Sequence, residues 1–376
     1  MGTKAVIHLE NFLHNIREVQ NRIGPNRRIC VPVKANGYGH GAVEISRASI
    51  QAGAYCLGVS SVTEAIELRK GGIGALIFIF AQPHPSEIHE IIEGDFCPFV
   101  SDREFVDLLD REAAGKKIKV NMKIDTGMGR LGCAAEDAPA FARYLKSKNS
   151  IDYMGTATHL AVSDSAAAEH VDYTGKQLAR FRDAVENIRA AGVNPGIIHA
   201  ANSGGVILHP ESWFDMVRPG IFLYGYKTAN EADLPDTGKP LEPLDPKPVM
   251  ELKTQVVFVK KVKKGQSVSY GRIWTADRDT TVATLHIGYA DGFPRCASNK
   301  WQAVISGRTY PVVGRICMDQ CMADLGPDTN VRRWDEAVIF GGPAPSAAEM
   351  ADKTGTFIYE VTCNINRRVP RVYVSS

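Results

Sequence analysis

Short apolar runs alternate with helix-period segments through the first part of the chain. Eight runs have the length and composition of buried strands, at residues 29–33, 55–60, 75–80, 97–100, 118–124, 153–159, 197–200 and 215–217. Segments such as 62–69 and 104–109 repeat apolar residues at helical spacing, and Ser60-Ser61 and Ser101-Asp102 are suitable caps for them. Eight β-then-α units predict an α/β fold with an N-terminal (β/α)8 TIM-like barrel. An open doubly wound sheet stays the alternative, because a count from one sequence can miss or invent a unit.

The pattern changes after a proline-rich segment at residues 234–248. Five prolines in these fifteen residues exclude regular helix and central strand. Beyond this segment, strand-like runs follow at 250–261, 267–270, 281–287, 303–306, 310–313, 322–325, 337–340 and 369–374, with one helix expected at 346–353. We therefore predict a barrel domain at 1–233 and a C-terminal, mostly antiparallel β domain, either barrel or sandwich, at 249–376. The linker between them is expected at 234–248.

Composition narrows the classes of partner. The chain of 376 residues has a net charge of +2, from 44 basic and 42 acidic residues, and no basic tract, which argues against nucleic acid. The apolar run at 75–81 is far shorter than the ~20 residues that a membrane-spanning helix needs. The N-terminus lacks the apolar core of a signal peptide, so we expect a cytoplasmic protein. The eight cysteines lack the paired spacing of a zinc site, so no metal is predicted.

Almost every predicted barrel strand ends in polar residues, or is followed closely by them. They are Lys34, Ser60, Ser61, Gln82, Ser101, Lys123, Asp125, His159, Asn202, Ser203 and Arg218. The C-terminal ends of barrel strands face one another across a single mouth, where active sites lie, so these side chains are expected to converge. Solvated loops are also polar, and this accounts for part of the pattern.

Lys34 is the most informative of these residues. It follows the apolar run 29–33 and opens the polar, glycine-rich loop 35–41. A partly desolvated amine loses its proton more readily, and a neutral amine can form a Schiff base with an aldehyde cofactor. A lysine that extends its ammonium group from a strand end to water is the plainer interpretation.

A Schiff-base lysine usually serves pyridoxal phosphate (PLP), whose phosphate needs an anion site. Residues 202–205, Asn-Ser-Gly-Gly, open a predicted helix after strand seven, and residues 218–221, Arg-Pro-Gly-Ile, follow strand eight. Barrels commonly bind phosphate with these two loops. Taken alone, both segments also suit ordinary surface turns. If Arg218 faced the pyridine nitrogen, it would stay protonated and leave the ring a weaker electron sink than an aspartate would.

Together these segments resemble the alanine racemase family. The loop 33–41 is similar to the cofactor-lysine motif of the family, and further similar motifs lie at 123–130, 158–159, 202–203, 217–221, 268–271, 287–292, 314–319 and 367–371. These ordered motifs extend over both predicted domains. The resemblance implies a PLP-bearing barrel, a C-terminal β domain, and a homodimer in which each subunit completes the active site of the other.

The resemblance also implies roles for single residues. Lys34 would carry the cofactor and act as a catalytic base, and Tyr270 of the partner subunit would be the second base. Further contacts with the cofactor would come from Tyr38, His159, Ser203, Arg218, Gly220, Ile221 and Tyr359. Arg130 and the partner subunit's Met318 would contact the substrate. Lys123 matches a lysine that many members carry in carbamylated form.

The chemistry is consistent with these roles. Racemisation removes the α-proton from one face and returns a proton to the other, so it needs two acid/base groups on opposite faces. Lys34 would serve one face and Tyr270 the other, with His159 linking the phenol to Arg218. On its residue type alone, Tyr270 is better interpreted as an aromatic residue that packs on the β domain. The prediction is PLP-dependent interconversion of L-alanine and D-alanine.

Three alternatives stay open. A barrel-type PLP decarboxylase would carry a second-domain cysteine motif and a glycine-triplet phosphate loop, which this sequence lacks. A PLP carrier without turnover would not need a second base. A racemase of serine, or of broader range, is the third, although Tyr289 and Tyr359 would crowd a larger side chain. The residues do not distinguish supply of D-alanine for peptidoglycan from L-alanine catabolism, and they assign no function to 226–248.

Overall fold

The computed structural model describes residues 2–229 and 242–375. The chain divides into two compact units. The barrel unit contains Leu13–Gly37 and Ala42–Lys247, and the β unit contains Met1–Phe12, Tyr38–Gly41 and Pro248–Ser376. No helix in the described residues is both long enough and apolar enough to span a lipid bilayer.

The barrel unit is a closed ring of parallel strands. In the described residues these are β2 (Arg28–Pro32), β3 (Cys56–Val59), β4 (Ile77–Ile79), β5 (Cys97–Val100), β6 (Ile118–Asp125), β8 (Ile151–Ala157), β9 (Ile197–His199) and β10 (Met216–Val217). Each strand pairs with the next, and β10 pairs with β2, which closes the ring. A short strand, β7 (Cys133–Ala134), pairs with the end of β6. All eight predicted strands are present, so the predicted barrel is confirmed and the open sheet is excluded.

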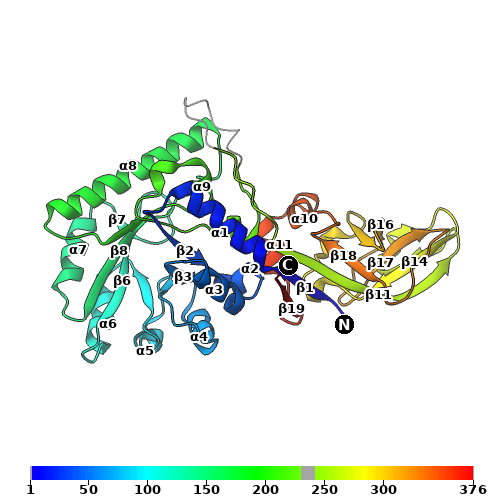
Figure 1. Cartoon of the computed structure of the whole chain (residues 1–376), viewed down its shortest axis with the longest axis horizontal. Helices are drawn as coiled ribbons and strands as arrows, with labels where there is room; N and C mark the ends of the chain where they lie inside the picture. Colours follow the sequence, from blue (N-terminus) through cyan, green and yellow to red (C-terminus); the bar gives the residue numbers. More distant parts are fainter. Residues whose placement is uncertain (1, 230–241, 376) are drawn as a thin grey trace. The chain divides into compact units, whose positions relative to one another are not determined.

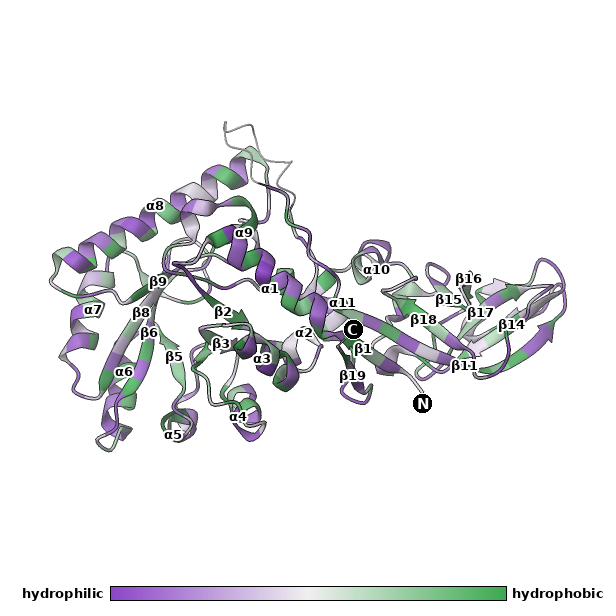
Figure 2. Cartoon of the chain, in the orientation of Figure 1, coloured by the Kyte–Doolittle hydropathy of each residue, from purple (hydrophilic) through white to green (hydrophobic). Residues whose placement is uncertain are grey.

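Helices follow the strands as the apolar spacing predicts. They are α1 (Leu9–Ile23), α3 (Ala42–Gln51), α4 (Val62–Lys70), η1 (Pro85–Glu87), α5 (Ile88–Glu93), α6 (Arg103–Glu112), α7 (Ala138–Ser147), α8 (Ala168–Ala190), α9 (Ser203–Leu208), η2 (Pro210–Ser212) and η3 (Ile221–Tyr224). Helices α4 to α8 lie outside the strands (Figure 1). Ser61 caps α4 and Asp102 caps α6, as expected. Along α8, hydrophilic and hydrophobic bands alternate, because one face packs on the barrel (Figure 2).

The β unit is built on a mostly antiparallel sheet. Its strands are β1 (Lys4–His8), β11 (Met250–Val262), β14 (Thr280–Leu285), β15 (Gln302–Ile305), β16 (Arg308–Val313), β17 (Cys321–Gly326), β18 (Glu336–Phe340) and β19 (Arg371–Val374). Short elements are β12 (Ser267–Val268), η5 (Tyr270–Arg272), β13 (Trp274–Thr275), η6 (Tyr289–Asp291), η7 (Arg295–Ala297), α10 (Ala347–Thr354) and α11 (Ile358–Cys363). Because β11 pairs with both β18 and β14, strands β11 and β14 to β18 close on themselves. Of the two predicted forms, barrel and sandwich, the structure is a barrel.

The N-terminal strand departs from the simple two-part division of the sequence. Strand β1 pairs antiparallel with β11 and parallel with β19, so the first residues belong to the sheet of the β unit. Local pattern cannot reveal this, because β1 and β11 are joined only by long-range hydrogen bonds. Residues 230–241 lie outside the described residues, and with them much of the predicted linker. The domain bounds 1–233 and 249–376 therefore stay a prediction.

Candidate active site

Lys34 stands at the carboxyl end of β2, where the backbone takes a rare conformation. It opens α2 (Lys34–Tyr38), a single turn in which Ala35, Asn36 and Tyr38 have φ of 51°, 54° and 52°. Left-handed backbone costs roughly 1–2 kcal/mol for each non-glycine residue. Strain of this kind persists only where surrounding contacts hold it, and it is concentrated at functional sites. The glycine-rich loop predicted from the sequence is thus a left-handed turn.

Contacts with neighbouring segments hold this turn. The amide of Gly37 donates to Val33 O at 2.8 Å, and the amide of Ala42 donates to Asn36 Oδ1 at 3.0 Å. The amide of Ala35 donates to Glu64 Oε1 at 2.6 Å. Since Glu64 also closes the capping box of α4, one carboxylate ties the loop after β2 to the loop after β3.

Arg218 lies buried after β10 among neutral acceptors. Its guanidinium donates to His199 Nδ1 at 2.7 Å, Thr158 O at 2.8 Å, Ala200 O at 3.0 Å and His159 Nδ1 at 3.4 Å. Among the described residues no carboxylate accepts from it, and burial lowers the pKa of Arg218 to about 10. Both imidazoles must be neutral at Nδ1 to accept, so the guanidinium carries the charge of this cluster.

Two buried polar residues that the sequence analysis did not single out continue this network. His199 Nε2 lies 3.3 Å from Asn121 Oδ1, and Asn121 Nδ2 donates to Cys97 Sγ at 3.1 Å. A side chain at Gly155 would come within 2.6 Å of Asn121 Oδ1, so the glycine leaves room for the amide. The signal in the sequence was a polar residue next to apolar ones: Asn121 lies between Val120 and Met122 in β6, and His199 follows Ile197 and Ile198 in β9.

Positive charge gathers around His159. Burial lowers the pKa of the His159 imidazole well below its usual value. The charges that add to this effect come from Lys123, Arg218, Arg130 and Lys34. Four of the predicted site residues, from the ends of three strands (β2, β6 and β10), therefore act on one imidazole, which is the convergence expected at a barrel mouth.

Lys123 is the buried cation of this group. Burial, followed by the charges of Arg218 and Arg130, lowers the pKa of its amine well below the usual value. Its Nζ lies 5.9 Å from the centre of the Phe99 ring. Arg130, on the loop after β6, is exposed.

The two predicted phosphate loops meet at Ser203. Ser203 Oγ accepts from the amides of Gly220, at 2.9 Å, and Phe222, at 3.2 Å. Asn202 caps α9 by accepting from the amide of Gly205 at 3.0 Å. Because Ser203 already accepts two hydrogen bonds, its own O–H is left to donate. Ser203, Gly220 and Ile221 are all buried at the carboxyl ends of β9 and β10.

In the β unit, Tyr38 packs against Tyr359 of α11. Their ring centres lie 5.9 Å apart, and Phe357 stacks on Tyr359 at 4.7 Å. The next residue, Gly39, has φ +88°, and a Cβ there would lie 1.9 Å from Thr362 O. The chain after the lysine turn thus passes directly against α11, which the sequence analysis did not predict.

Tyr270 and Met318 lie on neighbouring loops of the β unit. Ser269 Oγ donates to Arg315 O at 2.6 Å, and a Cβ at Gly314 would lie 2.8 Å from Ser269 Cβ. Both loops leave their apolar side chains in solvent, since Tyr270 is 72% and Met318 54% exposed. Large exposed apolar side chains at neighbouring positions are typical of a surface that another protein covers.

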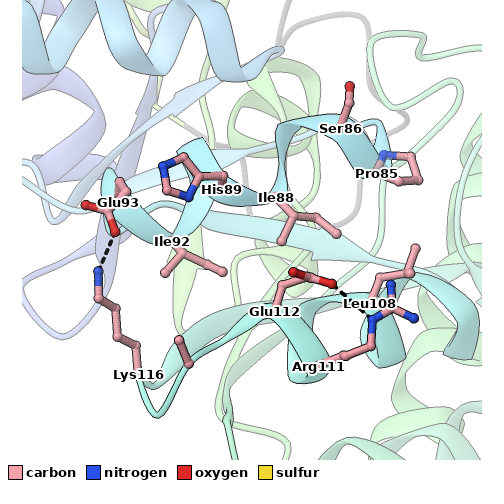
Figure 3. Close-up of a pocket in the computed structure, with 11 residues that line it drawn as sticks. Pro85, Ser86, Ile88, His89, Ile92, Glu93, Leu108, Arg111, Glu112 and Lys116 are labelled. Atoms are coloured by element: carbon pink, nitrogen blue, oxygen red, sulfur yellow. Dashed lines mark hydrogen bonds and ion pairs between the residues drawn. The ribbon is translucent and has the colours of Figure 1, made fainter.

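A pocket elsewhere on the barrel unit lacks these residues. A cavity of about 360 Å³ lies between η1, α5, α6 and the turn that follows (Figure 3). Its apolar floor includes Ile88, Ile92 and Leu108, and ion pairs between Glu93 and Lys116 and between Arg111 and Glu112 lie at its rim. None of the predicted site residues lines it.

A closed (β/α)8 barrel with a strained lysine turn at its mouth, linked to a β barrel, defines the class of two-domain barrel enzymes. The chain belongs to the alanine racemase family: its N-terminal domain model matches residues 7–228, and its C-terminal domain model matches residues 249–373. The alanine racemase of Treponema denticola is 47% identical, over 99% of this chain and 98% of that protein.

Solved structures agree with this assignment. Alanine racemase from the D-cycloserine producer Streptomyces lavendulae has a TM-score of 0.91 and 34% identity, with 100% of this chain and 98% of that chain covered. A histidine racemase from Leuconostoc mesenteroides has a TM-score of 0.88 at 25% identity, with 100% and 98% covered.

Proposed function

We propose that this chain interconverts L-alanine and D-alanine with pyridoxal phosphate held at the barrel mouth. The observation that carries the proposal is the setting of Lys34, on a left-handed turn and close enough to His159 to act on it together with three other cations. The substrate is an amino acid with a carboxylate, and the names of the relatives support alanine.

The residues present suit this cofactor. A phosphate is anionic, and Ser203 offers a buried O–H beside the loop that carries Gly220 and Ile221. Among the described residues, Arg218 donates to neutral acceptors alone, so its charge is available to a ring nitrogen with a lone pair. Tyr38 and Tyr359 would add contacts from the β unit. These roles remain proposals.

Bound there, the cofactor would act as an electron sink that makes the α-C–H bond of the amino acid acidic. Lys34 Nζ would remove or return the proton on one face. Tyr270 Oη of a second subunit would do so on the other face, in a homodimer. The exposure of Tyr270 and Met318 in the single chain supports this arrangement, because a phenol that serves a partner's site must lie on the surface of its own chain.

Arg130 would bind the substrate carboxylate, and Lys123 would be carbamylated. Only a neutral amine attacks carbon dioxide, and burial favours the neutral form of Lys123. The Nζ lone pair of the neutral amine forms an N–C bond with carbon dioxide, and one N–H proton passes to water, so a neutral amine beside Arg130 and Arg218 becomes an anion. With 13C-bicarbonate, a carbamate carbonyl resonance should appear and be absent from Lys123→Arg.

A racemisation assay tests the main proposal. Purified protein reconstituted with PLP should equilibrate D-alanine and L-alanine, and borohydride should fix the cofactor on Lys34. Tyr270→Phe should lower kcat by about 10²–10⁴, the usual contribution of a general acid/base. Tyr310→Phe, on β16, is the matched control and should keep the wild-type rate. Carbon dioxide release without racemisation would favour the decarboxylase alternative, and binding without turnover would favour a carrier.

Mixing two inactive variants tests the shared site. A Lys34→Ala subunit supplies an intact Tyr270, and a Tyr270→Phe subunit supplies an intact Lys34. Random pairing should restore about a quarter of the wild-type activity, because half of the dimers are mixed and each has one complete site. A site built within one chain would gain nothing from mixing.

Specificity is tested with enantiopure serine and histidine beside alanine. The likeness to a histidine racemase supports including a large side chain, since the same fold is found in a protein of that name. Turnover of alanine alone would agree with crowding by Tyr289 and Tyr359. The expected cytoplasmic location stays a prediction, as does the role in peptidoglycan supply.

A further inference from the structure

Helix α8 reaches the barrel mouth with two side chains that the proposed chemistry does not use. Tyr173 and Gln177 lie one helical turn apart on α8. Tyr173 Oη donates to Gly127 O at 2.7 Å. Gln177 is fully buried; its Oε1 accepts from the amide of Ala161 at 2.9 Å, and its Nε2 donates to His159 O at 3.1 Å. Both side chains therefore hold backbone rather than substrate.

The loop that they contact is the one that leads to Arg130. Asp125 Oδ1 accepts from the amides of Gly127, at 2.9 Å, and Gly129, at 3.1 Å. Burial opposes ionisation of Asp125, but these backbone N–H groups hold the pKa of the carboxyl below its usual range. The loop is thus folded around one carboxylate, and its outer surface is left to be anchored.

Close packing joins the helix to this loop. Gly127 has φ +135°, and a Cβ there would lie 2.7 Å from Tyr173 Oη and 3.4 Å from Gln177 Cγ. Gln177 Nε2 also lies 3.4 Å from Thr126 Oγ1, which in turn lies 2.8 Å from Thr158 Oγ1. The helix therefore contacts both strand ends, that of β6 before Arg130 and that of β8 before His159.

We propose that Tyr173 and Gln177 are positioning residues that fix Arg130 and His159 at the barrel mouth. Tyr173 holds the 125–130 loop through Gly127. Gln177 holds the main chain at His159 and Ala161, and so sets where the imidazole meets Arg218. The kinetic part of this inference rests on the proposed function, whereas the structural part does not.

Hydrogen exchange on the chain without cofactor tests the structural part. Tyr173→Phe removes one hydroxyl from a ring that is 41% exposed, so the fold should persist. Losing one hydrogen bond should speed exchange of the Gly127 and Gly129 amides by about threefold to tenfold. The matched control is Tyr144→Phe, which removes a hydroxyl bonded to Asp107 away from the mouth and should leave these amides unchanged. Equal exchange in Tyr173→Phe and the wild type would overturn the role of Tyr173.

The role of Gln177 is tested with Gln177→Leu, and Gln20→Leu is the matched control. Gln20 lies on α1, and its Nε2 donates to Ala52 O at 2.8 Å. With 13C-labelled histidine, the Cε1 resonance of His159 should shift in Gln177→Leu and not in Gln20→Leu. An unshifted resonance in a folded Gln177→Leu protein would refute the role of Gln177.

Kinetics separate positioning from a general loss of stability. Tyr173→Phe should raise KM by about threefold to tenfold while kcat stays within about twofold, since Arg130 would bind the carboxylate in substrate and transition state alike. A fall in kcat with unchanged KM would contradict the assignment. If the wild-type protein does not racemise any amino acid, the proposed function fails, and the exchange and resonance data still decide the positioning roles.

Discussion

Removing the Glu64 carboxylate should release the lysine turn. Glu64 Oε2, which closes the capping box of α4, accepts from the amide of Ser60 at 2.7 Å and from the amide of Ser61 at 3.3 Å. In Glu64→Ala both amides lose this acceptor. The amide of Ala35 loses its acceptor at 2.6 Å. Glu349→Ala is the matched control, because Glu349 closes the capping box of α10 with Ser346 at 2.7 Å and belongs to the β unit rather than the barrel unit.

The hydrogen bonds in the structure give the expected difference in the free energy of unfolding between Glu64→Ala and Glu349→Ala. Loss of a cap costs about 1 kcal/mol, which is the expected effect of Glu349→Ala on the free energy of unfolding. Hydrogen bonds to a charged group are worth about 1.5–3 kcal/mol, and two extra backbone donors depend on Glu64. Since Glu64 is half-buried, we take the lower value and expect Glu64→Ala to lose about 4 kcal/mol in total.

The functional consequence follows from the strain in the turn. Three left-handed non-glycine residues store roughly 3–6 kcal/mol. Only the hydrogen bond from Ala35 supports the turn itself, so Glu64→Ala removes about 1.5 kcal/mol of that support, and the affinity for PLP should fall about tenfold. Urea unfolding followed by circular dichroism and fluorescence titration with PLP measure the two effects. Equal losses of stability in the two variants, or wild-type PLP affinity in Glu64→Ala, would refute the reasoning.

Three further predictions concern the interior. Burial, followed by nearby positive charge, lowers the pKa of His159 and of His199, so below about pH 6.5 the unfolded chain binds up to two more protons than the folded one. The free energy of unfolding should therefore decrease as the pH is lowered, by up to ~2.7 kcal/mol per pH unit. Urea titrations of His199→Gln should show about half this slope. Arg218→Lys should lower the free energy of unfolding by about 2–4 kcal/mol, because one ammonium cannot satisfy four acceptors, and an unchanged urea midpoint would contradict this. Gly39→Ala should lower the free energy of unfolding by about 2–5 kcal/mol, because of backbone strain and a clash with a main-chain oxygen. Gly24 has a similar φ but open space around it, so Gly24→Ala should lower the free energy of unfolding by only about 1 kcal/mol. Equal losses for the two variants in thermal unfolding would exclude the clash.

The strands of the barrel and the residues at their ends were determined by the sequence alone. Most buried strands are apolar runs, and almost every run ends in polar residues, so a local pattern was enough to predict that Lys34, Lys123, His159 and Arg218 share one mouth. The motif resemblance then led to a family that the comparisons confirm.

Only the tertiary structure decided how those side chains are held. The left-handed turn after Lys34 depends on Glu64, the neutral surroundings of Arg218 depend on His199 and Asn121, and β1 pairs with strands hundreds of residues away. The physical reason is that the spacing of apolar residues can be recognised within a short stretch of sequence, and it indicates which residues of a strand or helix are buried. The partner of a buried donor or acceptor comes from any part of the chain that packing brings within about 3 Å, and no local pattern encodes that choice.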